Sequence, residues 1–281
     1  MSRRPDFRLH IPFVNGAVYI IDAMGGAGRW MEEELLDINY TKPHGRAIVR
    51  FQVDDGGDLR IALSKVEEAA RQGCAPIIHF ECHGHPQLGL QLGNTMFSWS
   101  SLEPMLRRIN VACGGNLGIV MAVCYGLLAI TPVHITRPTP FLFLIGSEGE
   151  IKQGRLKDEL PNFYRTMFST GSLEKALSCL PSCRPFHAEI LLAVSFGKFL
   201  RRTGFGRRRR EHIEERITLG RYLLGGNVDE DTLRRVRAEA KAATSLVARK
   251  AMFADISDYF LVGRSPSFTF ESLVSWVRLT E

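Results

Sequence analysis

The sequence predicts an α/β fold: a mostly parallel sheet flanked by helices, followed by a helical C-terminal portion. Five short apolar runs within the first 150 residues have the length and composition of buried strands. Amphipathic helical patterns lie between several of these runs, as the crossovers of a parallel sheet require. Beyond about residue 180 the chain is helical in pattern and rich in charge. We therefore expect an α/β domain over residues 1–180 and a helical portion over residues 181–281.

The five expected strands are rich in apolar and β-branched residues, as in strands that helices cover on both sides. In chain order they are 17–23 (AVYIIDA), 47–53 (AIVRFQV), 76–82 (PIIHFEC), 117–124 (LGIVMAVC) and 141–146 (FLFLIG). The glycines of DAMGGAGRW, after the first run, lack the spacing and the Lys-Ser/Thr pair of a phosphate loop. We expect an ordinary strand-to-helix turn there, in which Asp22 either ends the strand or orients a neighbouring group.

Helical periodicity is clearest at residues 58–73 and 98–115. The first pattern has Asp58 near its start and Gly73 at its end, and the second opens with serines suited to an N-cap. Because strands and helices alternate, function is expected at the carboxyl ends of the strands. Further helical patterns cover residues 156–171, 172–180, 187–204, 207–226 and 229–263.

Composition bounds the class of protein. The chain has 281 residues, of which 45% are hydrophobic, and it has no unbroken apolar run of membrane-spanning length, so we expect no membrane partner. The first ten residues, MSRRPDFRLH, precede no apolar stretch of signal-peptide length, and we expect a cytoplasmic protein. Six irregularly spaced cysteines in a chain of this size favour free thiols over a disulfide framework.

Chemically active residues follow two of the expected strands. One run leads into His83 and Gly84, and another ends in Cys124, which Tyr-Gly follows. Neighbouring parallel strands lie about 4.8 Å apart, so groups at their carboxyl ends can flank one substrate. A free thiol is mostly protonated at neutral pH, and an imidazole beside it can accept that proton. Gly84 has no side chain, so its N–H can form an oxyanion hole together with the N–H of Cys124.

The order strand-His-Gly, helix, strand-Cys-x-Gly resembles the caspase-like cysteine peptidase superfamily, in particular its prokaryotic caspase-homologue and CHAT-domain branch. Three further stretches are similar to that family: FSWSSLEPMLRRIN after the histidine, FLFLIGSEGEI as the next strand, and the helical NFYRTMFSTGSLEKAL. The resemblance covers roughly residues 15–180. It implies a caspase-like arrangement of the sheet and helices in the first domain.

The resemblance also implies a cysteine endopeptidase that hydrolyses peptide bonds of a protein substrate through a Cys-His dyad and needs no cofactor. Residue by residue, it implies Cys124 as nucleophile, His83 as general acid/base, and the backbone N–H groups of Gly84 and Cys124 as oxyanion donors. The biology that it implies is bacterial antiviral defence or programmed cell death, under the control of an activating or regulatory protein partner.

The chain departs from the family pattern beside the cysteine. Several relatives carry an acidic residue two positions earlier, which helps to select a basic substrate side chain, and caspases carry Gln-Ala-Cys. Here that position is Ala122, in Ala-Val-Cys, so neither selectivity is carried over. We expect Glu148 and Glu150 to line the substrate pocket. The Pro- and Thr-rich segment TPVHITRPTP is a candidate loop for self-cleavage, because it carries Arg137.

Alternatives stay open for the other histidines and cysteines. His85 is a rival general base, and we favour His83 because a glycine follows it directly. His79 alternates into the strand interior and favours a core histidine, while Cys74 and Cys113 favour structural roles. Two sets of residues offer metal ligands, but neither has the paired spacing of a zinc site, so we expect no metal. These sets are Cys82, His83 and His85, and Cys179, Cys183 and His187.

Six arginines lie between Arg201 and Arg210, and glutamates follow them. Such a run is most often a solvated helix face that pairs with the acidic residues. It also suits docking of a protein partner, which we favour over a nucleic acid because only Phe205 is interleaved. The alternative function is therefore a catalytically inactive caspase-like scaffold that binds a protein or nucleic-acid partner through its Arg-rich helices.

Overall fold

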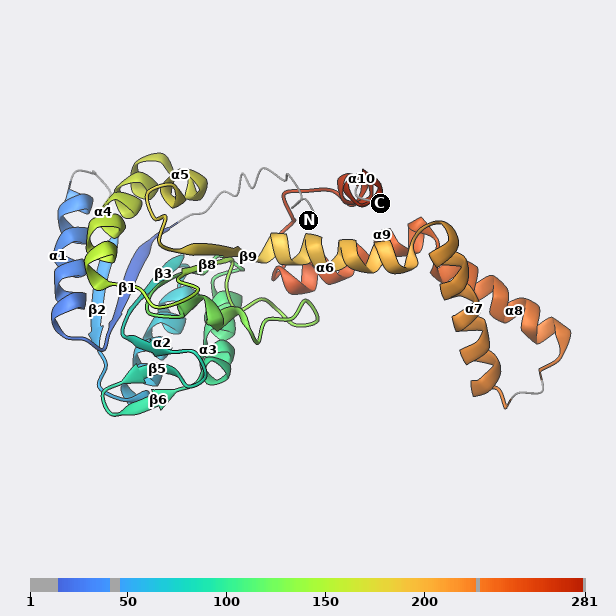
Figure 1. The fold of residues 1–281 in the computed structure, drawn as a ribbon, viewed down its shortest axis with the longest axis horizontal. Helices are drawn as coiled ribbons and strands as arrows, with labels where there is room; N and C mark the ends of the chain where they lie inside the picture. The colour runs from blue at the N-terminus through green and yellow to red at the C-terminus, as the bar shows by residue number, and fades with distance from the viewer. Residues whose placement is uncertain (1–14, 41–45, 226–227, 280–281) are drawn as a thin grey trace.

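A mostly parallel sheet of six strands forms the centre of the part of the chain that the structure describes (Figure 1). The computed structural model describes residues 15–40, 46–225 and 228–279. The strand order is β2-β1-β3-β7-β8-β9, and among the described strands of this sheet only β8 and β9 pair antiparallel. The prediction of a mostly parallel sheet flanked by helices, with a helical C-terminal part, is confirmed. The strands are Ala17–Asp22 (β1), Ala47–Gln52 (β2), Pro76–Glu81 (β3), Gly118–Ala122 (β7), Phe143–Gly146 (β8) and Arg184–His187 (β9).

Helices cover both faces of this sheet. One face packs against α2 and α3, and the other packs against α1, α4 and α5. The inner strands β1, β3 and β7 are buried along their whole length, and therefore the sequence shows them as nearly continuous apolar runs. The helices are Gly26–Tyr40 (α1), Gly56–Arg71 (α2), Trp99–Ala112 (α3), Gln153–Thr170 (α4) and Leu173–Leu177 (α5).

A second, antiparallel sheet lies between β3 and α3. Its strands are β4 (His83–His85), β5 (Gly89–Leu92) and β6 (Thr95–Phe97), and the sequence analysis predicts none of them. Runs of three or four residues carry too little periodicity to be distinguished from a turn. Their position matters for function, because β4 starts with His83, directly beyond the carboxyl end of β3.

The strand β9 is a correction to the predicted organisation. It lies in the portion from residue 181 onward that the sequence analysis treats as helical, and it pairs Phe186 with Leu144 in the sheet. Its sequence, Arg-Pro-Phe-His, holds a charge and a proline, which sheets tolerate at their edges. The strand ends at His187, and α6 begins at Ala188.

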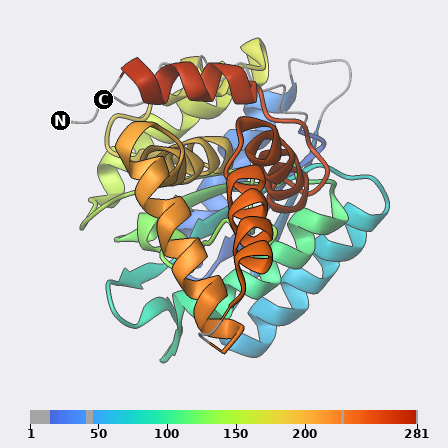
Figure 2. The ribbon, with the colours of Figure 1, turned by 90° about the vertical axis from the view of Figure 1, so that its right-hand side faces the viewer.

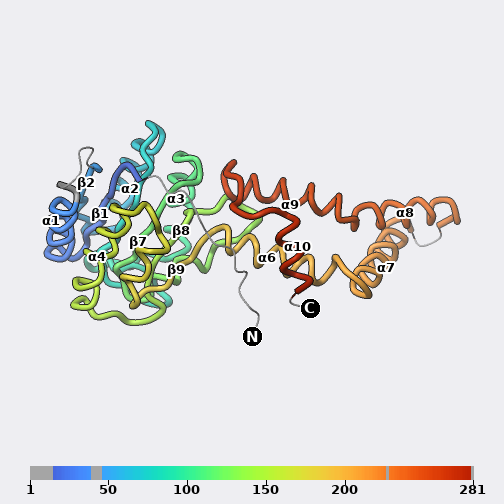
Figure 3. Tube along the Cα trace, turned by 90° about the horizontal axis from the view of Figure 1, so that it is seen from above, coloured from blue at the N-terminus to red at the C-terminus, as the bar shows by residue number. Residues whose placement is uncertain are grey.

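The helices after β9 extend away from the sheet (Figures 1 and 3). The long helices α6 and α9 lead outward and back, and α7 and α8 form a hairpin at the far end, side by side in Figure 2. Aromatic contacts among Phe196, Phe253 and Phe270 join α6, α9 and α10. These helices are Ala188–Thr203 (α6), Gly206–Leu223 (α7), Glu230–Ala243 (α8), Leu246–Phe260 (α9) and Phe270–Leu279 (α10).

Two expectations from composition concern the membrane and the start of the chain. Among the helices of residues 15–40, 46–225 and 228–279, none combines the length and the apolar character that crossing a bilayer requires. The expectation about a signal peptide rests on residues 1–14, which lie outside the described residues.

Candidate active site

Gly84 and Cys124 meet at the carboxyl edge of the sheet. The strands β3 and β7 are parallel neighbours with Glu81 beside Ala122, so the chain leaves both strands at the same level. A methyl group on Gly84 would lie 2.1 Å from the carbonyl oxygen of Cys124, and only glycine permits such an approach. The structure thus places the histidine-bearing segment directly against the cysteine.

The chain turns sharply just after Cys124. Tyr125 has φ 60° and ψ 18°, a left-handed conformation that is uncommon for residues other than glycine and that clusters at functional sites. Its N–H donates to the carbonyl of Gly149, at 2.8 Å. A Cβ on Gly126 would lie 2.5 Å from that of Met121, so this position also requires glycine. The Cys-Tyr-Gly sequence therefore forms a tight turn that leaves the Cys124 side chain half-buried at the strand end.

The loop before α4 contacts the thiol of Cys124. The N–H of Ile151 donates to Sγ across 3.4 Å, and the thiol can donate to the carbonyl of Ile151 across 3.7 Å. A backbone N–H directed at sulfur favours the thiolate, which is the nucleophilic form. The sequence alone does not reveal this contact, because its donor is a backbone N–H 27 residues along the chain from the cysteine, and a backbone group has no residue-type signal.

A cleft of about 620 Å³ opens beside the cysteine, a volume within the range of ligand-binding sites. It contains Glu150, one of the two glutamates expected in the pocket. The other, Glu148, is exposed outside the cleft, and its carboxylate lies 4.0 Å from Nε of Arg184. The residues that line the cleft are Gly84, His85, Pro86, Cys124, Tyr125, Glu150, Ile151 and Lys152.

The two candidate bases, His83 and His85, differ in their surroundings. His83 is exposed beside the cleft without lining it, and its imidazole has no hydrogen-bond partner among the described residues. His85 lines the cleft, and its Nδ1 accepts from the N–H groups of Gln87 and Leu88, each at 3.2 Å. The neutral tautomer that satisfies these bonds carries its proton on Nε2. His85 is thereby a hydrogen-bond donor in this arrangement, while both ring nitrogens of His83 are available for proton transfer.

A buried polar chain lies within the sheet close to the site. His79 is fully buried, with Nε2 3.0 Å from a Glu81 oxygen and Nδ1 2.9 Å from the hydroxyl of Tyr164 on α4. Burial, together with the charge of Glu81, raises the pKa of Tyr164 well above its usual value. His79 is thus a core histidine with both nitrogens bonded. Its hydrogen bonds with Glu81 and Tyr164 link β3 to α4.

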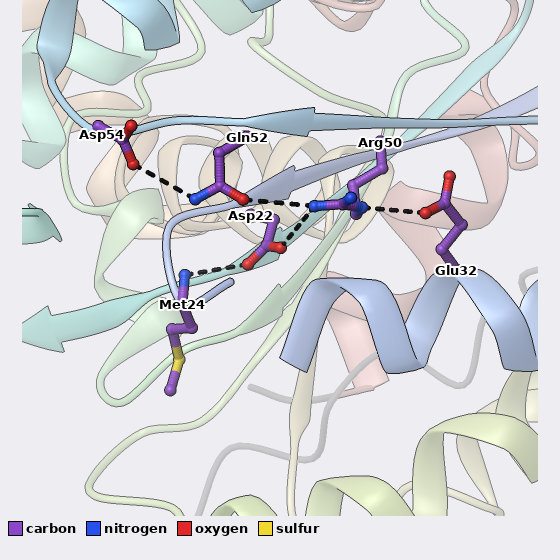
Figure 4. Close-up of polar contacts among 6 residues, drawn as sticks. All are labelled: Asp22, Met24, Glu32, Arg50, Gln52 and Asp54. Atoms are coloured by element: carbon purple, nitrogen blue, oxygen red, sulfur yellow. Dashed lines mark hydrogen bonds and ion pairs between the residues drawn. The ribbon is translucent and has the colours of Figure 1, made fainter. Parts of the chain in front are cut away.

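Asp22 holds the turn that follows β1. Figure 4 shows its carboxylate accepting from the N–H of Met24 at 2.9 Å and pairing with Arg50, whose Nη1 lies 3.1 Å from Oδ2. Arg50 also binds Glu32 through Nε, at 2.9 Å, and Gln52, at 3.3 Å. These contacts support the structural interpretation of Asp22, because its carboxylate is committed to the turn and to the arginine.

The other cysteines are free thiols that do not line the cleft. Burial raises the pKa of Cys113 to about 11 and that of Cys183 to about 12, which disfavours their reactive thiolate form. Burial also raises the pKa of Cys82, in the core on the α2 and α3 face. Within the described ranges no group of three or more His, Cys, Asp or Glu side chains is placed to hold a metal ion.

The segment TPVHITRPTP links the turn after Cys124 to β8 and is held on the C-terminal side of Arg137. Arg137 is exposed, as a cleavage site must be. Beyond it, the carbonyl of Pro138 accepts from Nε of Arg107 at 3.0 Å, and the N–H of Thr139 donates to Phe260 at 2.8 Å. Self-cleavage at Arg137 stays a prediction, and a cut after Arg137 would leave the new N-terminal end, at Pro138, attached to α3 and α9.

Comparison of the chain with protein-family models gives no match, and comparison with curated proteins gives none either.

Proposed function

We propose that the protein is a cysteine endopeptidase with Cys124 as nucleophile and His83 as general acid/base. The observation that carries the proposal is the approach of Gly84 to the Cys124 peptide, which puts the histidine segment and the cysteine at one end of an open cleft. The left-handed turn at Tyr125 and the N–H of Ile151 at Sγ support it, because both suit a nucleophilic thiol at the edge of the cleft.

The reaction proceeds in two steps. The Cys124 thiol gives its proton to His83, and Sγ bonds to the carbonyl carbon of the scissile peptide. The C–N bond then breaks, and His83 returns the proton to the leaving amine, which leaves a thioester. In the second step His83 takes a proton from water, the hydroxide attacks the thioester carbon, and the acid product departs as the thiol is restored.

Backbone N–H groups stabilise the oxyanion of each tetrahedral intermediate. Cys124 and Gly84 are the proposed donors, because the two peptides lie against one another at the mouth of the cleft. Loss of one such donor typically lowers kcat by about 10²–10³-fold. His85, with its Nε2 proton, provides a neutral donor in the same cleft.

The proposed substrate is a protein chain, and the proposed setting is the cytoplasm. Glu150 and Lys152 bring charges of both signs to the rim of the cleft, so the lining favours neither an acidic nor a basic substrate side chain by itself. The resemblance to caspase-homologue and CHAT-domain peptidases supports a role in bacterial antiviral defence or programmed cell death, with an activating or regulatory protein partner.

A catalytically inactive scaffold is the second candidate, and one observation favours it. The Cys124 thiol is occupied by both backbone groups of Ile151, and His83 stands outside the cleft lining. A scaffold of this kind keeps the fold and binds its partner through the Arg-rich helices.

Cleavage of a peptide library, followed by mass spectrometry, separates the two candidates. We expect cuts from the native chain, no cuts from Cys124→Ala or His83→Ala, and unchanged cuts from the matched variant Cys113→Ala, whose sulfur lies at the end of α3. Cuts that persist in Cys124→Ala would overturn the assignment of the nucleophile. An activity in cells that survives Cys124→Ala would favour the scaffold.

A further inference from the structure

The net positive charge of the chain lies in its C-terminal helices. Residues 198–281 carry 17 Lys and Arg against 11 Asp and Glu, so their formal charge equals the +6 of the whole chain. Most of these charges fall on α7 and α8, the hairpin that stands farthest from the sheet in Figures 1 and 3. This hairpin is also remote from the cleft, so what it binds can be tested independently of the proposed peptidase activity.

Much of the hairpin's positive charge is not neutralised locally. Ion pairs join Arg207 to Glu211, and Arg234 to Glu230 and Asp231. Five other basic side chains are exposed and have no ion pair or hydrogen bond with any described residue. These five are Arg210, Arg216, Arg221, Arg237 and Lys241.

Helical geometry places four of these five cations, all except Arg216, on one face of the hairpin, because Arg216 lies on the other side of the buried stripe of α7. The two helices pack through Ile213 and Ile217 of α7 and through Ala240, with Leu233 and Val236, of α8. Arg210 and Arg221 are 11 residues apart, about three turns, so they share a side of α7. Arg237 and Lys241 share a side of α8 in the same way. Seen along each helix from its N-terminus, both pairs are displaced from the buried residues in the same rotational direction. Because the two helices are antiparallel and both right-handed, residues displaced in this way lie on the same face of the hairpin.

Two acidic residues share this face without cancelling its charge. Glu230 is bound to Arg234, and Glu214 lies between Arg210 and Arg221 on α7. Because Arg234 engages Glu230, the four unpaired cations of this face stand against one unpaired carboxylate, that of Glu214. A helix of the length of α8, 14 residues, is about 21 Å long, so the face presents a row of positive charge of that extent.

The chemistry of this face fits the phosphates of a nucleic acid duplex. Arginine, which supplies three of the four unpaired cations on this face, binds phosphate oxygens bidentately. Among the described residues of this face no aromatic side chain lies between the cations to stack unpaired bases, which argues against a single strand and leaves a duplex. The exposed apolar residues Leu219 and Tyr222 belong to another face of α7, beside Glu211 and Glu215, so an anionic membrane would meet carboxylates where its apolar contacts would form.

We propose that the α7–α8 hairpin binds double-stranded nucleic acid through its phosphate backbone, with Arg210, Arg221, Arg237 and Lys241 as contact residues. The sequence alone favours a protein partner over a nucleic acid, whereas the arrangement of cations on the hairpin favours a nucleic acid duplex. The scarcity of aromatic residues in the arginine run counts against single-strand binding, but a duplex held by its phosphates needs no stacking. The binding is independent of base sequence, because the contacts reach only the backbone.

Fluorescence anisotropy with labelled 20-base-pair DNA and RNA duplexes of mixed sequence tests the proposal. The protein is the full chain carrying Cys124→Ala, so that self-cleavage cannot interfere. With about four phosphate contacts, the affinity for at least one duplex should fall about 100-fold between 50 and 200 mM salt. Replacing all four contact residues by Gln should weaken binding at least 30-fold at 100 mM salt and flatten the salt dependence. Replacing the three arginines by Lys should preserve the salt dependence.

A matched variant controls for net charge. Arg155→Gln, Lys157→Gln, Arg165→Gln and Lys175→Gln together remove four exposed cations from α4 and α5, and this variant should bind within threefold of the parent. Three results would overturn the proposal: no binding of either duplex at 50 mM salt, equal weakening by the two quadruple variants, or tighter binding to a single strand or to phosphatidylserine vesicles than to both duplexes. Circular dichroism and thermal melts verify that each variant is folded.

Discussion

The carbonyl oxygen of Cys124 occupies the space in which a side chain on Gly84 would begin. This relationship makes Gly84 the most direct test of the site. Gly84→Ala must displace either β4 or the Cys124 turn, which we expect to destabilise the fold by about 1–3 kcal/mol and to lower kcat/KM at least tenfold. The measurements are thermal unfolding and peptide cleavage. Gly154→Ala is the matched control, because nothing lies within 4 Å of a Cβ at that position. Full activity in Gly84→Ala would show that the approach is not needed for catalysis.

The two histidines can be told apart by the bonds of His85. Asn at position 85 keeps an acceptor for the N–H groups of Gln87 and Leu88 but cannot act as a base, so His85→Asn should keep the stability of the native chain. We expect this variant to retain activity within about threefold and His83→Ala to lose at least about 100-fold in kcat. The reverse pattern would assign the base to His85. His85→Ala, which leaves both N–H groups without their acceptor, should be less stable by about 1 kcal/mol.

The contact between Ile151 and Cys124 predicts a change in thiol reactivity. Proline has no N–H, so Ile151→Pro removes the donor that points at Sγ. We expect alkylation of Cys124 by iodoacetamide at pH 7 to slow several-fold, and peptide cleavage to slow about tenfold. Ile151→Ala keeps the N–H and serves as the control for loss of the side chain. Equal alkylation rates in the two variants would show that the N–H does not activate the sulfur.

The buried imidazole of His187 predicts loss of stability in acid. Burial, with a smaller contribution from Arg264, lowers the pKa of His187 from 6.5 to about 3. The unfolded chain therefore binds a proton below pH 6.5 that the folded chain does not. The stability associated with the neutral imidazole is complete above pH 6.5 and is lost as the pH falls toward 3, by about 1.4 kcal/mol for each unit.

Urea unfolding of the native chain and of His187→Asn, between pH 7.5 and 4.5, measures this effect. Asn can accept from the N–H of Glu189, as Nδ1 of His187 does at 3.1 Å, and it does not titrate. The carboxylates titrate alike in both proteins, so the difference between the two curves isolates the imidazole. A difference that stays constant over this range would contradict the prediction.

The sequence predicts the main sheet well because burial on both faces gives its strands a strong and simple signal. It fails at β4, β5, β6 and β9 for a physical reason. The first three are too short for a period to show, and β9 lies at an edge, where Pro185 and Arg184 are tolerated and no apolar run is required.

Some residues of the candidate site are likewise predictable from the sequence, and others are not. Gly84 and Cys124 are predictable as neighbours, because the carboxyl ends of adjacent parallel strands meet at one edge. The sequence does not reveal that His85 rather than His83 lines the cleft. The side chain of His85 is held there by hydrogen bonds from the N–H groups of Gln87 and Leu88, and these bonds depend on the turn after β4. The contact of Ile151 with Cys124 cannot be predicted from the sequence either, because its donor is a backbone N–H, which nearly every residue type has.

The junction between β9 and α6 makes the sheet and the outer helices mechanically continuous. The last residue of β9, His187, caps α6 with its own side chain, so no flexible joint separates them. On the opposite side of the junction, the carboxylate of Glu189 holds the backbone and hydroxyl of Ser267. The helix α6 is about 24 Å long and spans the distance between the sheet and the hairpin. At its start, β9 lies beside β8, the strand that leads into the loop on Cys124.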